Sequence, residues 1–215
     1  MTSIPVARPR RRRRRREDSE QEILEAAERL LRERPFRELT VDDLMAATSQ
    51  SRTAFYRHFA DRKDLLARLF RDLGDELWEM SEGWLQGGGT EPRVDGRQAL
   101  ERLADVYEAH GPLLVAIAEA ASHNDELERV YRGLVQSFVD ATTARIEREI
   151  AAGRTELPDA RHAAVALIWM TERHLATTFG RRGARPGARA AVVETLATIW
   201  VRALYSREQA TSPPA

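Results

Sequence analysis

Three groups of residues in this sequence have side chains suited to chemistry or to molecular recognition. Residues 10–16 are all arginine, and guanidinium groups bind phosphates well. Residues 51–59, SRTAFYRHF, mix hydrogen-bonding side chains with aromatic ones. A third group, of apolar residues at helical spacing, fills the second half of the chain and could form either a packed core or a ligand cavity.

Signs of catalysis are missing from the sequence. The chain has no cysteine, which excludes disulfides, thiolate nucleophiles and cysteine-bound zinc. Its five histidines do not form an HExxH motif, and there is no GxSxG elbow or glycine-rich phosphate loop. We therefore expect no enzyme, no cofactor and no metal site, and a helical enzyme is the weakest alternative.

Charge is distributed unevenly along the chain. The formal net charge is zero, but eight of the 34 basic residues lie between Arg8 and Arg16. The remainder has 26 basic against 34 acidic residues, a balance of −8, and would repel nucleic acid. The longest apolar run, residues 163–170, is far shorter than the roughly 20 residues that a membrane span needs. We expect a cytoplasmic protein with no membrane partner, whose basic function is local.

Helical periodicity predicts an all-α chain of about nine helices. Pro35 ends the first helix, and Thr40 is a suitable N-cap for a short helix over residues 41–48. A second short helix follows over 52–59, and Asp61 begins a longer one. Glycine and proline clusters then separate five more helices, near 96–109, 112–122, 124–152, 159–180 and 187–206.

This organisation predicts four segments. They are a disordered arginine-rich arm over 1–17, an N-terminal three-helix helix-turn-helix DNA-binding domain over 18–65, a C-terminal helical ligand-binding and dimerisation domain over 66–206, and a disordered tail over 207–215. In a helix-turn-helix the second short helix can enter the DNA major groove, where Arg52 could read guanine. The same spacing fits equally well two helices that merely complete a bundle.

Residues 51–66, SRTAFYRHFADRKDLL, resemble the DNA-binding signature of TetR-family regulators. In that signature the recognition helix ends in an aromatic-Tyr-x-x-Phe block, followed by lysine and a leucine pair. The resemblance implies an all-α homodimer in the bacterial cytoplasm, associated with the nucleoid, that represses transcription from a palindromic DNA operator until a small hydrophobic effector releases it. By position, the resemblance implies that Arg52 contacts a base edge and that Tyr56 and Lys63 contact phosphates. The full set of implied DNA contacts is Thr40, Ser51, Arg52, Thr53, Tyr56, Arg57, His58 and Lys63.

Three positions depart from the family pattern. Ser49 stands where glycine is usual, which puts the left-handed geometry of the turn in question. Gln50 stands in place of a small aliphatic residue. Ala54 replaces a common threonine and removes one expected contact.

The later helices resemble the subgroup typified by the ethionamide-activation repressor, through residues 166–173, ALIWMTER, and 199–201, IWV. That resemblance implies a tunnel for elongated hydrophobic ligands. Two of the matching positions, Ile168 and Thr171, replace amides, so the implied cavity is more apolar. The other interpretation of each residue is ordinary core. Matching positions are Leu103, Tyr107, Tyr131, Phe138, Thr142, Ile168, Thr171, Glu172, Leu175 and Trp200.

The last helix carries two apolar seams, one through Val192, Leu196, Ile199 and Ala203 and the other through Val193, Ala197, Trp200 and Leu204. One seam can face the core of its own chain and the other a second subunit, so we expect a homodimer through the last two helices. A fully buried final helix in a monomer is the alternative.

The arginine run is interpreted as a flexible arm that lies along phosphates or enters the minor groove. It could also be a solvated tail, or the main contact of a sequence-tolerant architectural DNA-binding protein. The residues concerned are Arg10, Arg11, Arg12, Arg13, Arg14, Arg15 and Arg16.

Overall fold

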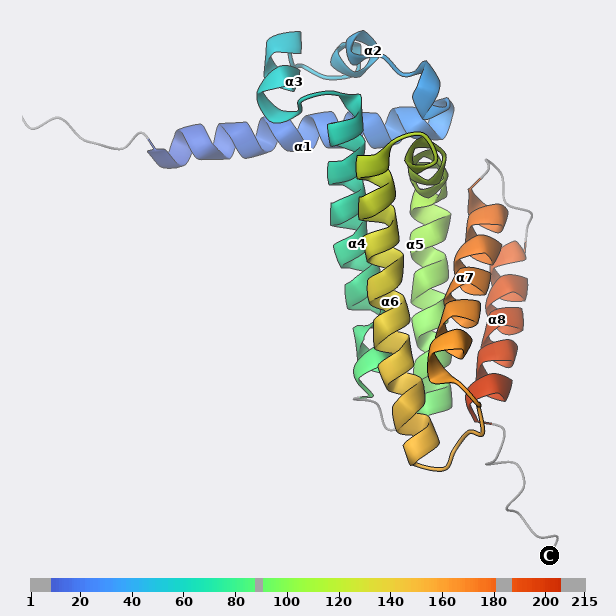
Figure 1. Ribbon diagram of the computed structural model, residues 1–215. Helices are drawn as coiled ribbons and strands as arrows, with labels where there is room; N and C mark the ends of the chain where they lie inside the picture. Colours follow the sequence, from blue (N-terminus) through green and yellow to red (C-terminus); the bar gives the residue numbers. More distant parts are fainter. Residues whose placement is uncertain (1–8, 88–90, 181–186, 206–215) are drawn as a thin grey trace, which may run out of the picture. The chain divides into compact units, whose positions relative to one another are not determined.

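The computed structural model describes residues 9–87, 91–180 and 187–205 of the 215-residue chain (Figure 1). Helices make up all the regular structure in these ranges, which confirms the all-α prediction. The chain divides into two compact units, Met1–Leu69 and Phe70–Ala215, and the second is called the body below. The helices are α1 (Pro9–Glu33), the 3-10 helix η1 (Phe36–Glu38), α2 (Val41–Ala46), α3 (Arg52–His58), α4 (Arg62–Gln86), α5 (Pro92–Ala121), α6 (Asp125–Ala151), α7 (Ala160–Phe179) and α8 (Ala188–Leu204).

The first helix begins earlier than the sequence predicted. Residues 9–17, predicted to belong to a disordered arm, form the first turns of α1. Arginine has a high helix propensity, proline is accepted in a first turn, and no glycine interrupts the segment before Glu33. Residues 1–8 and the predicted tail at 207–215 lie outside the described residues.

The first unit closes α1, α2, α3 and the start of α4 around a small apolar core. Thr40 begins α2 with a capping box, in which its hydroxyl accepts from the Asp43 amide at 3.1 Å and the Asp43 carboxylate accepts from the Thr40 amide at 2.8 Å. The Thr40 hydroxyl and amide lower the pKa of Asp43 to about 2. Fully buried side chains of this core are Ile23, Leu39, Leu44, Phe55 and Leu66.

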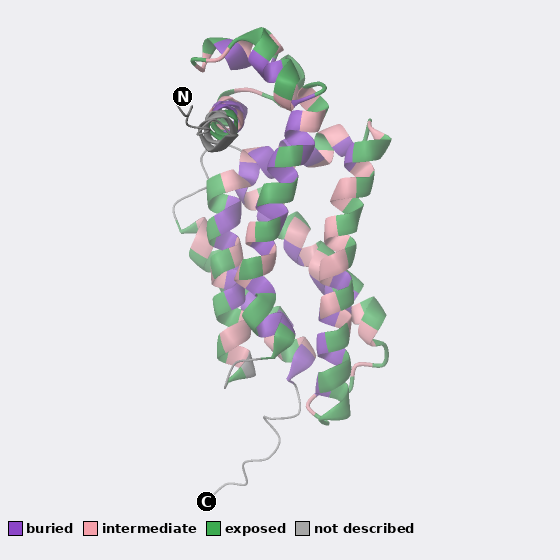
Figure 2. Cartoon of the chain, turned by 90° about the vertical axis from the view of Figure 1, so that its left-hand side faces the viewer, coloured by how far each residue is buried: buried purple, intermediate pink, exposed green. Residues whose placement is uncertain are grey.

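The body is a helical bundle in which helices that follow one another along the chain run antiparallel, so that α5 and α7 run parallel (Figure 1). Close backbone contacts join α5 to α6, α7 and α8, and join α7 to α6 and α8. Buried residues gather along the inward faces of these helices (Figure 2). The part of α4 that belongs to the body meets α6 and α8 through large rings, with centroids 5.3 Å apart for Trp78 and Phe138 and 5.3 Å apart for Trp84 and Trp200.

A single helix, α5, replaces the two that Gly111-Pro112 was expected to separate, and Pro112 lies inside it. Proline disfavours a helical residue before it, but glycine has no Cβ to clash with the proline ring. Gly111 is also the point at which α5 approaches the end of α7. A Cβ built on Gly111 would lie 2.3 Å from the carbonyl oxygen of Phe179. This close packing keeps the segment helical, and it accounts for one helix fewer than predicted.

Gly111→Ala should therefore lower the free energy of unfolding by about 1–3 kcal/mol, since the added methyl group forces α5 and α7 apart. Gly133→Ala is the matched control, because nothing lies within 4 Å of a Cβ built there in the middle of α6. That control should be neutral, or should stabilise by up to about 1 kcal/mol through helix propensity. Urea unfolding of both variants measures the difference in their free energies of unfolding. Equal effects would show that α5 and α7 have room for an added methyl group.

Candidate nucleic-acid interface and ligand cavity

The turn between α2 and α3 is held by Glu22 of α1. Its carboxylate accepts from the Ser49 amide at 2.6 Å, from the Ser49 hydroxyl at 3.0 Å and from the Gln50 side chain at 2.6 Å. These bonds, the first above all, lower the pKa of Glu22. Every positive φ in the described residues belongs to glycine, so Ser49 does not adopt the left-handed geometry that its position had put in question.

The outer side of α3 presents four of the predicted DNA contacts together. Arg52, Thr53, Tyr56 and Arg57 line one open depression, and Tyr56 is 53% exposed. Residues 52, 53, 56 and 57 follow the i, i+1, i+4, i+5 pattern of one helix face. Ser51 caps the helix by accepting from the Ala54 amide at 3.2 Å. The structure therefore gives α3 a continuous exposed face of donors.

Arg52 is engaged within the protein. Its Nη1 lies 2.9 and 3.0 Å from the two carboxylate oxygens of Asp42 on α2. Interaction with Tyr56 and the negative charge of Asp42 raise the pKa of Arg52. Because the guanidinium is 58% exposed, it can exchange this carboxylate for a base edge or a phosphate. The ion pair with Asp42 orients the guanidinium group on the exposed face of α3.

His58 does not reach this face, and the predicted DNA contact from it is corrected. Its side chain is fully buried, with Nδ1 3.6 Å from the carboxylate of Glu20 on α1. Neither ring nitrogen has a hydrogen-bond partner among the described residues. Position 58 shares the inward side of α3 with Ala54 and Phe55, and burial there lowers the pKa of His58.

Other predicted contacts lie in more varied settings. Lys63 is exposed in the first turn of α4, where its amide donates to Asp61 at 2.7 Å. Thr40 is exposed, but its hydroxyl is occupied by Asp43. Arg16 is exposed, while the side chains of residues 10–15 lie outside the described ones.

The body contains a cavity of about 120 Å³, roughly ten times the space that one water molecule requires. Nine of the ten predicted ligand-binding residues line it, and Leu175, which is buried in the core, does not. Sequence reasoning missed the wall that α4 contributes. That wall repeats every seven residues through Phe70, Leu77 and Trp84, a spacing that marks one helix face.

Polar groups in the cavity are few and differ in their bonding. The Thr171 hydroxyl accepts from the indole of Trp200 at 2.9 Å, and the Ser81 hydroxyl donates to the Leu77 carbonyl at 3.0 Å. Thr142 Oγ1 and Glu172 Oε2 are buried and have no hydrogen-bond partner among the described residues. An apolar cavity with a few convergent polar groups is typical of small-molecule sites.

Comparison with known proteins agrees with this geometry. Residues 23–69 match the family of bacterial regulatory proteins called tetR, and residues 96–206 match the C-terminal domain of the transcriptional regulator EthR. The chain belongs to the TetR family of bacterial transcriptional regulators. No helix in the described part of this TetR-family chain is long and apolar enough to cross a membrane.

Relatives within the TetR family cover most of the chain. It is 31% identical to the HTH-type transcriptional regulator EthR of Mycobacterium tuberculosis H37Rv over 200 residues, 89% of each chain. Identity to EthR of Mycolicibacterium smegmatis is 30% over 191 residues, 87% of each. Among solved structures, Salmonella enterica GusR superposes with a TM-score of 0.71 at 18% identity, covering 87% of this chain and 95% of that one, which shows a shared fold.

The burial of His58 predicts a specific pH dependence. Its pKa is lowered below 6.5 in the folded protein, so the unfolded chain takes up the proton first as the pH falls. Stability should thus decline below about pH 6.5 and be unaffected by this group above it. His58→Gln should flatten the decline, whereas His162→Gln, which removes an exposed histidine on α7, should not.

Proton NMR titration of the imidazole signals, assigned with the two variants, measures the pKa directly. A His58 signal that titrates at or above the usual histidine value would contradict its burial.

Proposed function

We propose that this protein is a homodimeric repressor of the bacterial cytoplasm and nucleoid. It binds a palindromic operator through α3 and is released by a small hydrophobic ligand held in the body. The observation that carries the proposal is the presence, in one chain, of an exposed face of donors on α3 and a preformed apolar cavity in the body. An architectural DNA-binding protein would have no use for such a cavity.

The exposed face of α3 supports a division of roles among the DNA contacts. Arg52 supplies a planar guanidinium that can pair bidentately with guanine in the major groove. Tyr56 and Lys63 suit phosphates, since both are exposed and donate one or more hydrogen bonds. Thr53 and Arg57 share the depression with Arg52 and add contacts at its edges.

Exposed apolar residues on the last two helices support the homodimer. Val165 and Trp169, one turn apart on α7, are 36% and 39% exposed, and Ile199 on α8 is 39% exposed. Large apolar side chains left in solvent are candidates for an interaction surface. Val192 and Leu196, which the sequence placed on the same seam as Ile199, are buried in the core of their own chain. The proposed dimer contact on α8 therefore includes Ile199 but neither Val192 nor Leu196.

Arg52→Ala should reduce operator affinity by about 1–3 kcal/mol and relax specificity at one base pair, since alanine cannot make the bidentate pair with guanine. Arg132→Ala, which removes an arginine 73% exposed on α6 of the body, is the matched control and should leave binding unchanged. The measurement is footprinting of genomic fragments followed by titration of the protected site. Protection should cover one short palindrome with half-sites about one helical turn apart or more. Uniform coating of DNA would instead identify an architectural protein.

Deleting residues 1–16 should weaken binding to all DNA sequences alike and flatten its salt dependence. Each phosphate that the deleted arginines no longer neutralise should remove about 0.9 from the slope of log affinity against log salt concentration. Titrations at several salt concentrations, on operator and on random DNA, measure both effects. An unchanged slope would show that the arginines do not bind DNA.

A further inference from the structure

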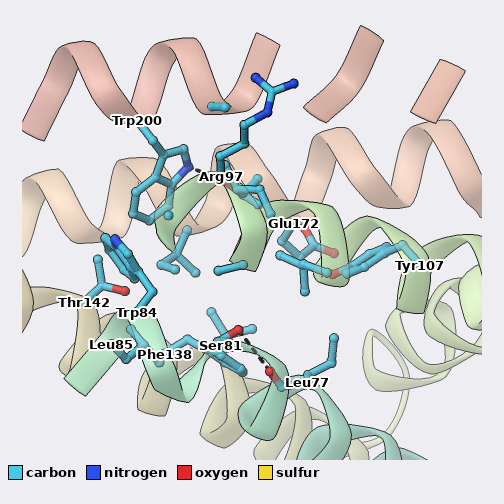
Figure 3. A pocket seen from close by; sticks show the side chains of 18 of the residues that line it. Leu77, Ser81, Trp84, Leu85, Arg97, Tyr107, Phe138, Thr142, Glu172 and Trp200 are labelled. Carbon is cyan, nitrogen blue, oxygen red and sulfur yellow. Dashed lines mark hydrogen bonds between the residues drawn. The ribbon is translucent and has the colours of Figure 1, made fainter. Parts of the chain in front are cut away.

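One end of the cavity carries a carboxylate with spare hydrogen-bonding capacity. Glu172 lies on α7 beside Tyr107 of α5, at the end opposite Trp84 and Thr142 (Figure 3). Its Oε2 is buried and has no hydrogen-bond partner among the described residues. An unsatisfied buried carboxylate oxygen is costly, and a ligand that brings a donor removes that cost.

Two tyrosines lie near this carboxylate. Tyr107 and Tyr131 line the cavity beside Glu172, and Phe70 stacks on Tyr131 with ring centroids 5.9 Å apart. Burial and the negative charge of Glu172 raise the pKa of both tyrosines, and a side-chain hydrogen-bond interaction with Glu172 adds to the rise for Tyr131, so both hydroxyls stay neutral. A carboxylate flanked by neutral aromatic rings attracts organic cations through charge and through the ring faces.

The two arginines that line the cavity, Arg93 and Arg97, are already engaged, and Arg173 is not among the lining residues. Arg173 Nε lies 3.9 Å from Glu172 Oε2, beyond hydrogen-bond distance, and its side chain is 72% exposed. Arg97 points away from the cavity centre (Figure 3) and pairs with Glu194 at 2.7 Å. Arg93 donates to the Tyr205 carbonyl at 3.0 Å. An anionic ligand would have to displace one of these partners, whereas a cation meets Glu172 directly.

We propose that the effector is a lipophilic amine, whose protonated nitrogen binds Glu172 between Tyr107 and Tyr131 and whose apolar part lies along the cavity toward Trp200. This assignment rests on the proposed function as a ligand-released repressor, and it specifies the chemical class of the ligand. The Thr171 hydroxyl is engaged by Trp200, and the unpartnered Thr142 hydroxyl is neutral. Glu172 is the one acidic residue among the described residues that line the cavity, so Glu172 selects the charged end of the ligand.

The test compares three probes of equal chain length, octylamine, octan-1-ol and octanoate, at neutral pH. Binding to the full-length protein is followed by tryptophan fluorescence, since Trp84 and Trp200 line the cavity, and by calorimetry. Octylamine should bind at least about tenfold more tightly than octan-1-ol, as a charge-assisted hydrogen bond provides. Glu172→Gln should bring that ratio close to one while leaving the affinity for octan-1-ol unchanged.

Two further variants separate charge from structure. Tyr131→Phe keeps the ring and the carboxylate, so the preference for the amine should persist. Glu128→Gln removes an exposed carboxylate that pairs with Arg132 on α6, and it should have no effect. Circular dichroism checks that each variant is folded, and Glu172→Met, which also removes the charge at similar side-chain length, replaces Glu172→Gln if that variant is not.

Release of a footprinted operator by each probe distinguishes the two proposals. If octan-1-ol or octanoate binds at least as tightly as the amine and releases the operator, the amine assignment is wrong and the repressor proposal stands. A preference that survives in a folded Glu172→Gln variant also overturns the assignment. If none of the three probes binds, both the assignment and the ligand-released part of the proposed function fail.

Discussion

The cavity of the body depends on a buried ion pair that anchors one end of α4. The side chains of Arg145 and Glu149, one turn apart on α6, are 5% and 1% exposed and lie 2.7 Å apart. Arg145 also donates to the Trp84 carbonyl at 2.8 Å, in the last turn of α4, where carbonyls lack helical partners. Arg148 satisfies the Leu85 carbonyl in the same way at 2.6 Å. Each desolvated charge thus has a partner, and the end of α4 is fixed without close backbone packing.

Between the start of the body and this ion pair, aromatic rings set the distance between α4 and the rest of the body. A helix that packs through rings such as Trp78 against Phe138 lies farther from its neighbours than one that packs through small residues, and the spaces between the rings are not filled. The same rings line the opening that results. Packing and the lining of the cavity in this body therefore use one set of side chains. The lining positions were predicted through the resemblance to the ethionamide-activation repressor, because apolar periodicity alone does not distinguish a packed core from a cavity.

Local patterns in the sequence predicted the helices and the exposed face of α3, because both follow from spacing within one segment. His58 was misassigned although the pattern contained the signal, since position 58 shares a helix face with Phe55 and imidazole was counted as a surface group. The hydrogen bonds of Glu22 reach Ser49 and Gln50, which lie 27 and 28 positions further along the chain, and no local pattern predicts such a pairing. The helix end predicted at Gly111-Pro112 was wrong for a related reason, because packing of α5 against α7 overrides the local preference.

The approach of α5 to α7 at Gly111 gives the walls of the cavity unequal stiffness. With the Phe179 carbonyl where a Cβ of residue 111 would stand, these two helices have no room to move closer, and their separation is set by backbone atoms that cannot change rotamer. The α4 wall, by contrast, is built from side chains that can turn. The α5–α7 side of the cavity therefore cannot contract, whereas the shape of the α4 side depends on the rotamers of its side chains.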